Sequence, residues 1–368
     1  MMAAITVFNV VGTRPNFMKI APVIAAMKVD GRLRPILVHT GQHYDRKMSK
    51  VFFEDLGLPL PDINLSVGSG SHARQTGEVM VRFEEAVAES RPDAVVVVGD
   101  VNSTLAAALV AAKLHIPVAH VEAGLRSFDR DMPEEINRVL TDAISDYLFV
   151  TERAGVANLA AEGIAGEKVF FVGNVMIDSL LANRQRAAGS DILTRFGLCE
   201  RAYVPLTLHR PSNVDNEKSL TSIMDTLSDL SDKMEVIFPV HPRTRKQLAT
   251  FGMLEKARQF PRLIITDPLN YLDTICLVEK ARFVITDSGG LQEETTYLRI
   301  PCLTVRPNTE RPITISQGSN KLTSLETLKS DIDHILNGYS RQCTIPDLWD
   351  GNAGKRIISE LIQFQADN

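Results

Sequence analysis

Two short β-branched runs, each followed by a carboxylate, constrain the fold of this chain more than any other feature. The runs are residues 94–98 and 117–121, and patterns of this kind predict buried strands. Asp100 follows the first run and Glu122 follows the second. Because the carboxyl ends of parallel strands open at one edge of a sheet, we expect both acids to point into one cavity. Paired carboxylates in such a place indicate proton transfer.

The length and the order of the elements predict the fold class. The 368 residues are enough for two domains of roughly 170 to 190 residues each. Strand patterns alternate with helical ones along the chain, which predicts right-handed βαβ units and parallel sheets covered on both faces. We therefore expect an α/β protein with two doubly wound Rossmann-like domains that face each other across a cleft.

Turn and linker signals predict where the domains divide. Strand patterns continue to residue 172, and Gly173-Asn174 with the polar residues 189–191 mark a linker region. The first domain is therefore expected at residues 1–172 and the second at residues 173–352. Residues 353–368 have an amphipathic helical pattern that is expected to pack back on the first domain.

Charge, cysteine usage and missing motifs argue against several classes of protein. The net charge is -5 and basic residues are scattered, which argues against a nucleic-acid groove. No C-x-x-C pair occurs, and no apolar stretch approaches the roughly 18–20 residues of a membrane span, so we expect a cytoplasmic protein without a membrane partner. The patterns G-x-G-x-x-G, G-x-S-x-G and the P-loop are absent, and the histidine spacing does not suit a metal. No cofactor or metal is expected.

A glycine-rich helix start in the second half predicts a diphosphate site. Ser288, Gly289 and Gly290 follow a short apolar strand and open a helix. Glycines let backbone N–H groups approach an oxyanion, and the helix N-terminus favours its charge. Glu294, one turn later, offers the two acceptors that a ribose diol needs. A plain capping turn and an exposed helix acid are the alternatives.

Histidines and cations at other strand ends extend the candidate site. His209 and His241 each follow a strand of the second half, where catalytic, phosphate-binding and purely structural roles are all open. Arg14 and Lys19 lie at the first strand-to-helix junction, where they either contact phosphate or are solvated surface charges. Arg311 lies on a loop that is expected to close over the cleft.

Eight segments of the sequence resemble, in content and order, motifs of the non-hydrolysing UDP-N-acetylglucosamine 2-epimerases. They are GTRPNFMKIAP, TGQHYD, VVGDVNST, HVEAGLRS, MPEEINR, TLHRPSN, TDSGGLQEE and NTERP, and they cover the chain from Gly12 to about Asn320. The resemblance implies the two-domain GT-B fold and the interconversion of UDP-GlcNAc and UDP-ManNAc without nicotinamide or metal. In that family UDP leaves with loss of the C2 proton, giving 2-acetamidoglucal, and then re-adds.

The resemblance also implies roles for the candidate residues. Asp100, Glu122 and Glu134 match the catalytic acids, which must serve both faces of the sugar ring, and His209 matches the histidine at the diphosphate. The candidate contacts of the UDP-sugar are Arg14, Lys19, His241, Ser288, Gly289, Gly290, Glu294 and Arg311. We further expect a homodimer and a role in the biosynthesis of cell-surface polysaccharides.

Two departures from the family pattern leave the substrate open. Ser212 stands where many members have a glutamate, and Ile313 stands where many have the glutamate of TERPE. The alternatives are an epimerase of a related 2,3-diacetamido uronic acid sugar, a hydrolysing epimerase, a GT-B glycosyltransferase and a catalytically silent sensor. Three acids around one cleft favour the epimerase over the glycosyltransferase, which usually needs one base.

A regulatory site is a further open question. Bacterial members that a second UDP-GlcNAc regulates use a Gln-His-x-x-Gln pattern, of which this chain keeps Gln42 and His43. Arg74 is a third candidate for that site. Asp45 stands close to the place of the second glutamine, so the sequence leaves activation undecided.

Overall fold

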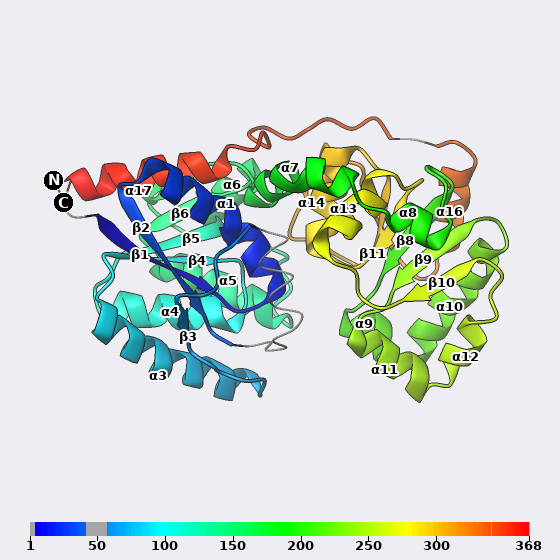
Figure 1. Cartoon of the computed structure of the whole chain (residues 1–368), viewed down its shortest axis with the longest axis horizontal. Helices are drawn as coiled ribbons and strands as arrows, with labels where there is room; N and C mark the ends of the chain where they lie inside the picture. The colour runs from blue at the N-terminus through cyan, green and yellow to red at the C-terminus, as the bar shows by residue number, and fades with distance from the viewer. Residues whose placement is uncertain (1–3, 42–56, 340, 368) are drawn as a thin grey trace. The chain divides into compact units, whose positions relative to one another are not determined.

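The chain folds into two compact units, each built around a parallel sheet (Figure 1). The computed structural model describes residues 4–41, 57–339 and 341–367. One unit is formed by Met1–Ala182 with Asp347–Asn368, and the other by Asn183–Pro346. The C-terminal helix therefore belongs to the first unit, although it comes last in the chain.

In its described residues, the first unit holds a seven-stranded sheet. Its strands are β1 (Ile5–Val11), β2 (Leu33–His39), β3 (Ile63–Asn64), β4 (Ala94–Val98), β5 (Val118–Ala123), β6 (Tyr147–Val150) and β7 (Val169–Phe171). Its helices are α1 (Arg14–Asp30), α3 (His72–Ser90), α4 (Asn102–Lys113), α5 (Pro133–Ile144), α6 (Arg153–Ala161), the 3-10 turn η1 (Gly166–Lys168), α17 (Ala353–Asp367) and most of α7 (Val175–Ala188). The strands are parallel in the order β3-β2-β1-β4-β5-β6-β7.

Apolar side chains on both faces hold this sheet between helices. All five residues of β4 are buried, as expected for a central parallel strand. Phe8 and Val95 pack with Phe83 of α3 and with alanines of α4, whose small side chains allow a close approach. Helices α1 and α17 lie side by side on the other face (Figure 1).

The second unit repeats this architecture with six strands among the residues described for it, 183–339 and 341–346. They are β8 (Tyr203–Thr207), β9 (Glu235–Pro239), β10 (Leu263–Thr266), β11 (Val284–Thr286), β12 (Cys302–Val305) and β13 (Asn320–Thr323). The helices are α8 (Ile192–Phe196), α9 (Pro211–Val214), α10 (Glu217–Ser231), α11 (Pro242–Thr250), α12 (Met253–Ala257), α13 (Tyr271–Glu279), α14 (Gly289–Leu298), α15 (Ile313–Ser316) and α16 (Leu328–Leu336). The strands are parallel in the order β10-β9-β8-β11-β12-β13.

Alternating side chains of the second sheet enter two separate cores. Val236 and Phe238 of β9 pack with α10 and α16, whereas Ile237 between them packs with α8, α13 and α14. A period of two with both faces buried is the mark of a doubly wound sheet. The predicted fold class, α/β with two doubly wound sheets, is confirmed.

The strand orders locate the edge where ligands bind in such folds. Each order reverses direction once, between β1 and β4 in the first sheet and between β8 and β11 in the second. Crevices at the carboxyl ends of strands form at these reversals. The candidate residues after β1, β4, β8 and β11 therefore lie at the two switch points.

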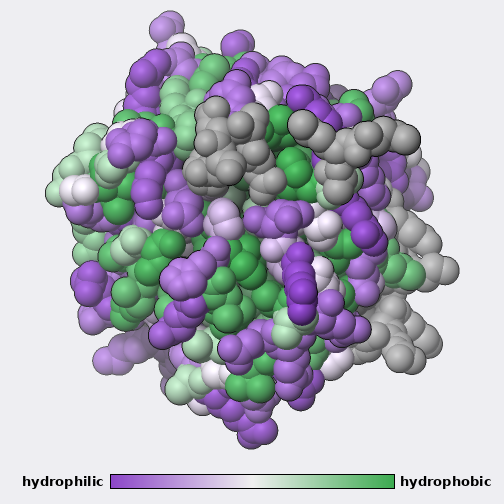
Figure 2. Space-filling model, turned by 90° about the vertical axis from the view of Figure 1, so that its left-hand side faces the viewer, coloured by the Kyte–Doolittle hydropathy of each residue, from purple (hydrophilic) through white to green (hydrophobic). Residues whose placement is uncertain are grey.

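None of the described helices is both long and apolar enough to cross a membrane. Figure 2 shows hydrophobic residues intermixed with hydrophilic ones on the face that it presents. Single exposed apolar side chains such as Val29 and Val81 are normal on folded proteins.

Candidate functional site

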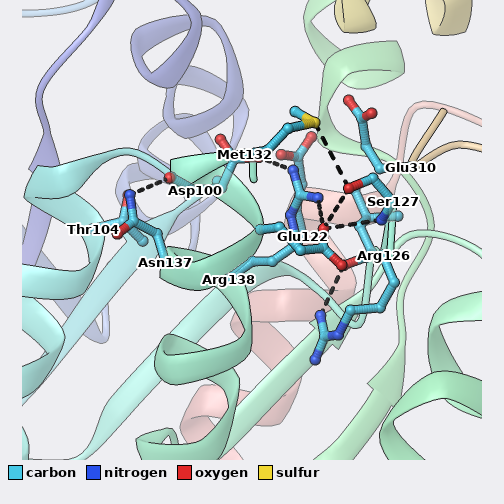
Figure 3. A network of polar contacts seen from close by, with 12 residues as sticks. Asp100, Thr104, Glu122, Arg126, Ser127, Met132, Asn137, Arg138 and Glu310 are labelled. Atoms are coloured by element: carbon cyan, nitrogen blue, oxygen red, sulfur yellow. Dashed lines mark hydrogen bonds and ion pairs between the residues drawn. The ribbon is translucent and has the colours of Figure 1, made fainter. Parts of the chain in front are cut away.

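Asp100 lies at the turn between β4 and α4. Gly99 precedes it with φ +72°, a left-handed conformation that redirects the chain after the buried strand. The Asp100 side chain is 28% exposed, and its carboxylate pairs with Arg138 of α5 (Figure 3). The side-chain amide of Asn137 donates to the backbone carbonyl of Asp100 at 2.9 Å. Asp100 is thus held from α5 and still reaches solvent.

Glu122 lies at a bulge near the end of β5. The register of β5 against β6 shifts between Val121 and Ala123, and Glu122 has φ +74°, which is strained for a residue with a side chain. Its carboxylate is buried and forms an ion pair with Lys19 of α1. Bulges that re-aim one side chain are common beside active sites. The backbone strain here is consistent with a functional acid.

The ends of β1, β4 and β5 meet at Gly99. A Cβ atom on Gly99 would lie 3.2 Å from Nζ of Lys19, 3.3 Å from Nδ2 of Asn16 and 3.7 Å from Oε2 of Glu122. The Asn16 amide donates to the carbonyl of Val98 at 2.8 Å. The two acids predicted to share an edge of the sheet therefore do share it, together with one lysine.

The neighbouring acids Glu134 and Glu135 have different environments. Glu134 is exposed on the first turn of α5. Glu135 is buried, where it accepts hydrogen bonds from the N–H and hydroxyl of Ser127 and from the N–H of Phe128, and pairs with Arg138. Burial raises the pKa of Glu135, but these hydrogen bonds and the Arg138 charge outweigh it, so the pKa lies below its usual value. Glu135 has a structural role, and Glu134 is the accessible acid.

Arg138 joins Asp100 to the loop before α5. Its guanidinium contacts the carboxylates of both Asp100 and Glu135, and Glu135 holds the backbone of Phe128 in a left-handed conformation (Figure 3). Arg138 was not among the predicted site residues. The signal was the i,i+3 spacing of Glu135 and Arg138 on one helix face.

The remaining candidates of the first unit are more peripheral. Arg14 is half-buried at the start of α1, behind the N-cap residue Thr13. Arg74 is mostly exposed and pairs with Glu78 one turn away. Gln42 and His43 lie outside the described residues. A regulatory site therefore stays a prediction.

In the second unit, Asp287 organises the strand ends of β8 and β11. Its carboxylate accepts the backbone N–H groups of His209 and Arg210 and the amide of Asn213, and faces Nδ1 of His209 at 2.8 Å. Burial raises the pKa of Asp287, but its hydrogen bond and charge interaction with His209, and the backbone N–H groups, lower it more. The His209 ring is 41% exposed and lies 5.8 Å from the ring of His241. A partly exposed histidine whose ring is oriented by a buried carboxylate can donate a hydrogen bond or a proton to a bound polar group.

The predicted diphosphate cradle opens α14. Ser288 is the N-cap residue, and Ser288, Gly289 and Gly290 are half-buried. A Cβ atom on Gly289 would lie 2.8 Å from Nη1 of Arg311 and 2.9 Å from Oε1 of Glu310, so a side chain at this position would displace the ends of these two side chains. The structure thus brings Arg311 next to the helix start.

Arg311 is part of a buried cluster of charges. Its Nε lies 2.8 Å from Glu293, and its Nη1 contacts Glu310, which also pairs with Arg306 at 2.8 Å. Only 6% of the Arg311 side chain is exposed. Contact of Arg311 with a diphosphate stays a prediction, because the structure gives it protein partners.

Glu294 should make the stability of the protein depend on pH. Burial raises its pKa to about 7, opposed by the hydrogen bond from the Tyr271 hydroxyl at 3.0 Å and assisted by the Glu293 charge. An unfolded glutamate ionises near 4.5, so between pH 4.5 and 7 the native state holds the extra proton. The free energy of unfolding therefore falls as the pH rises through this window, by about 3 kcal/mol in total.

Urea unfolding followed by circular dichroism at pH 5 and pH 8 measures this dependence. Glu294→Gln should remove the part of the change in unfolding free energy with pH that Glu294 causes. Glu255→Gln, at an exposed helical position, should keep the wild-type change with pH. Equal changes with pH in the wild type and in Glu294→Gln would contradict the assignment.

The comparisons with known proteins cover both units. A family model described as UDP-N-acetylglucosamine 2-epimerase matches residues 25–362. The UDP-N-acetylglucosamine 2-epimerase of Methanocaldococcus jannaschii is 43% identical over 362 residues, 96% of this chain and 97% of that protein. The crystal structure of M. jannaschii UDP-GlcNAc 2-epimerase in complex with UDP-GlcNAc and UDP matches with a TM-score of 0.91 at 42% identity, covering 98% of this chain and 100% of that one. A UDP-2,3-diacetamido-2,3-dideoxy-D-glucuronate 2-epimerase of Pseudomonas aeruginosa is 42% identical over 320 residues, 86% of this chain and 87% of that protein.

Proposed function

Because the chain belongs to the UDP-N-acetylglucosamine 2-epimerase family, we propose that it interconverts UDP-GlcNAc and UDP-ManNAc by inverting C2 of the sugar. The observation that carries this function is the placement of Asp100 and Glu122 at adjacent strand ends of the first unit. Carboxylates at such ends supply the proton transfers that inversion of a C–H centre requires.

The chemistry calls for elimination and re-addition. The C2 proton is not next to a carbonyl, so its direct removal and return is too costly. Breaking the bond from C1 to the UDP oxygen while a base takes the C2 proton gives 2-acetamidoglucal and UDP. The UDP oxygen then re-forms the bond to C1 as an acid delivers a proton to the opposite face of C2. Asp100, Glu122 and Glu134 serve as these acids and bases.

The second unit supplies the UDP contacts in this proposal. The backbone at Ser288, Gly289 and Gly290 receives the diphosphate at the start of α14. His209, oriented by Asp287, stabilises the charge on the leaving diphosphate. Glu294 accepts the ribose hydroxyls.

The P. aeruginosa relative raises the question of the substrate. It matches 86% of the chain, whereas the M. jannaschii epimerase matches 96%, and this broader match supports UDP-GlcNAc. Incubation with UDP-GlcNAc and with a UDP-2,3-diacetamido uronic acid in parallel compares the two. The homodimer and the cytoplasmic location also stay proposals. Light scattering of the purified protein measures its mass in solution and tests whether it is a homodimer.

Incubation with UDP-GlcNAc in D2O tests the function. We expect UDP-GlcNAc and UDP-ManNAc that both carry deuterium at C2, without added NAD or metal. An 18O label in the oxygen that joins C1 of the sugar to the β-phosphorus should spread over the β-phosphate oxygens, since the bond from C1 to this oxygen breaks. Free ManNAc with stoichiometric UDP would indicate a hydrolysing enzyme, and the absence of exchange would exclude epimerisation.

A further inference from the structure

His120 is a fully buried histidine in the middle of β5, and both of its ring nitrogens have partners. Nδ1 lies 2.6 Å from Oδ1 of Asp142 on α5, and Nε2 lies 2.8 Å from the carbonyl oxygen of Gly99. A carbonyl oxygen can only accept, so Nε2 must carry a proton. Whether Nδ1 also carries a proton depends on the ionisation of Asp142.

Asp142 accepts hydrogen bonds from several directions. Its Oδ2 accepts the N–H of Gly124 at 3.0 Å and lies 2.7 Å from the Arg126 guanidinium. Burial raises the pKa of Asp142, but the charge and hydrogen bond of His120, with Arg126 and the Gly124 N–H, lower it more. If Asp142 is ionised, its Oδ1 can only accept, and Nδ1 of His120 then donates to it. In that state both ring nitrogens carry a proton and the ring is an imidazolium.

The charges around this imidazolium balance. Arg126 also forms a two-bond pair with Glu162, at 2.7 and 2.6 Å. Two cations, His120 and Arg126, thus face two carboxylates, Asp142 and Glu162. A buried charge with matched partners on every side can persist in a protein interior.

The His120–Asp142 pair holds two backbone atoms, and these flank the two candidate acids. The Gly99 carbonyl belongs to the peptide bond that leads into Asp100, and Gly99 has φ +72°. The Gly124 N–H comes two residues after Glu122, and Gly124 has φ +77°. A single ion pair therefore fixes the backbone on both sides of the site, at turns that the strands alone do not define.

We propose that His120 is a positioning residue for the epimerisation: its imidazolium, paired with Asp142, holds the Gly99 and Gly124 turns so that Asp100 and Glu122 keep their relative placement. This inference rests on the proposed function for its link to catalysis. The doubly protonated ring is a separate consequence that requires no substrate.

Nitrogen NMR of the wild-type protein tests the protonation of His120. Protein labelled with 15N-histidine should show one ring with two slowly exchanging N–H correlations, both absent from His120→Gln. Slow exchange is expected because the ring is fully buried. A His120 ring with one bare nitrogen, or no such doubly protonated ring in the wild-type spectrum, would overturn the proposal whether or not any variant folds.

Kinetics of three variants test the positioning role. His120→Leu has no donor and should lower kcat for C2 inversion by about tenfold to a hundredfold, since small misplacements of reacting groups have effects of this size. KM should stay within about threefold, because the candidate UDP contacts lie mainly in the second unit. His120→Gln keeps one amide donor for the Gly99 carbonyl and should recover part of kcat, and the exposed His334→Gln should match the wild type.

Rates are expressed per folded molecule, from circular dichroism of the same samples. Wild-type kcat in His120→Leu, or a loss that follows only the folded fraction, would overturn the positioning role. Absence of C2 exchange in the wild type would instead refute the proposed function, and the NMR result would still decide the protonation of His120.

Discussion

Asp100→Asn should lower the rate of C2 inversion by at least about a hundredfold, the usual range for loss of a general acid or base. Asparagine has nearly the shape of aspartate but neither takes up nor releases a proton at neutral pH. The backbone of the site should persist, because the Gly99 turn and the contact of Asn137 with the residue 100 carbonyl do not involve the lost charge. Deuterium incorporation at C2 measures the effect.

Binding of UDP separates loss of chemistry from loss of the site. UDP should bind Asp100→Asn with nearly wild-type affinity in calorimetry, since Asp100 is not one of the proposed UDP contacts and most of these belong to the second unit. Asp131→Asn makes the same chemical change at an exposed residue before α5 and should leave the rate unaltered. Wild-type turnover in Asp100→Asn would remove Asp100 from the mechanism.

Much of the fold was predictable because most strands are apolar on both faces. The run of four valines in β4 predicts a strand buried on both faces of a covered sheet, and all five residues of β4 are buried. β13 was not predicted because it carries Asn320, which a sequence pattern places on a surface. In the structure Asn320 is buried, and its side chain contacts Thr304, Gln292 and Thr314. These partners lie 6, 16 and 28 residues from Asn320, and a local sequence pattern does not show that they meet it.

The locations of the site residues at the sheet edges were more predictable than their side-chain partners. Parallel topology alone brings Asp100 and Glu122 to one edge and places His209 beside Asp287. Charge does not show whether a cation contacts a ligand or another side chain. Lys19 was predicted as a substrate contact, and the structure pairs it with Glu122, 103 residues away. Its contact with the substrate stays a prediction.

Arg138→Met should lower the free energy of unfolding of the first unit by about 3–5 kcal/mol, the usual cost of removing one partner from a buried ion pair. Methionine fills much of the space of the arginine stem but leaves Glu135 without its cation. The three hydrogen bonds from Ser127 and Phe128 remain and limit the loss. Asp100, at 28% exposure, can be hydrated and adds less to the effect.

The single tryptophan, Trp349, makes this effect measurable in the correct unit. It is buried in the first unit, where its Nε1 donates to the Thr151 carbonyl at 3.2 Å, so its fluorescence reports unfolding of that unit in urea. Arg74→Met is the matched control, because it breaks an exposed Arg–Glu pair on α3 and should cost less than about 0.5 kcal/mol. Adding Glu135→Gln to Arg138→Met should restore part of the stability, since the uncompensated charge is then gone. Equal effects of Arg138→Met and Arg74→Met would show that the contacts of Arg138 contribute no more than a surface pair.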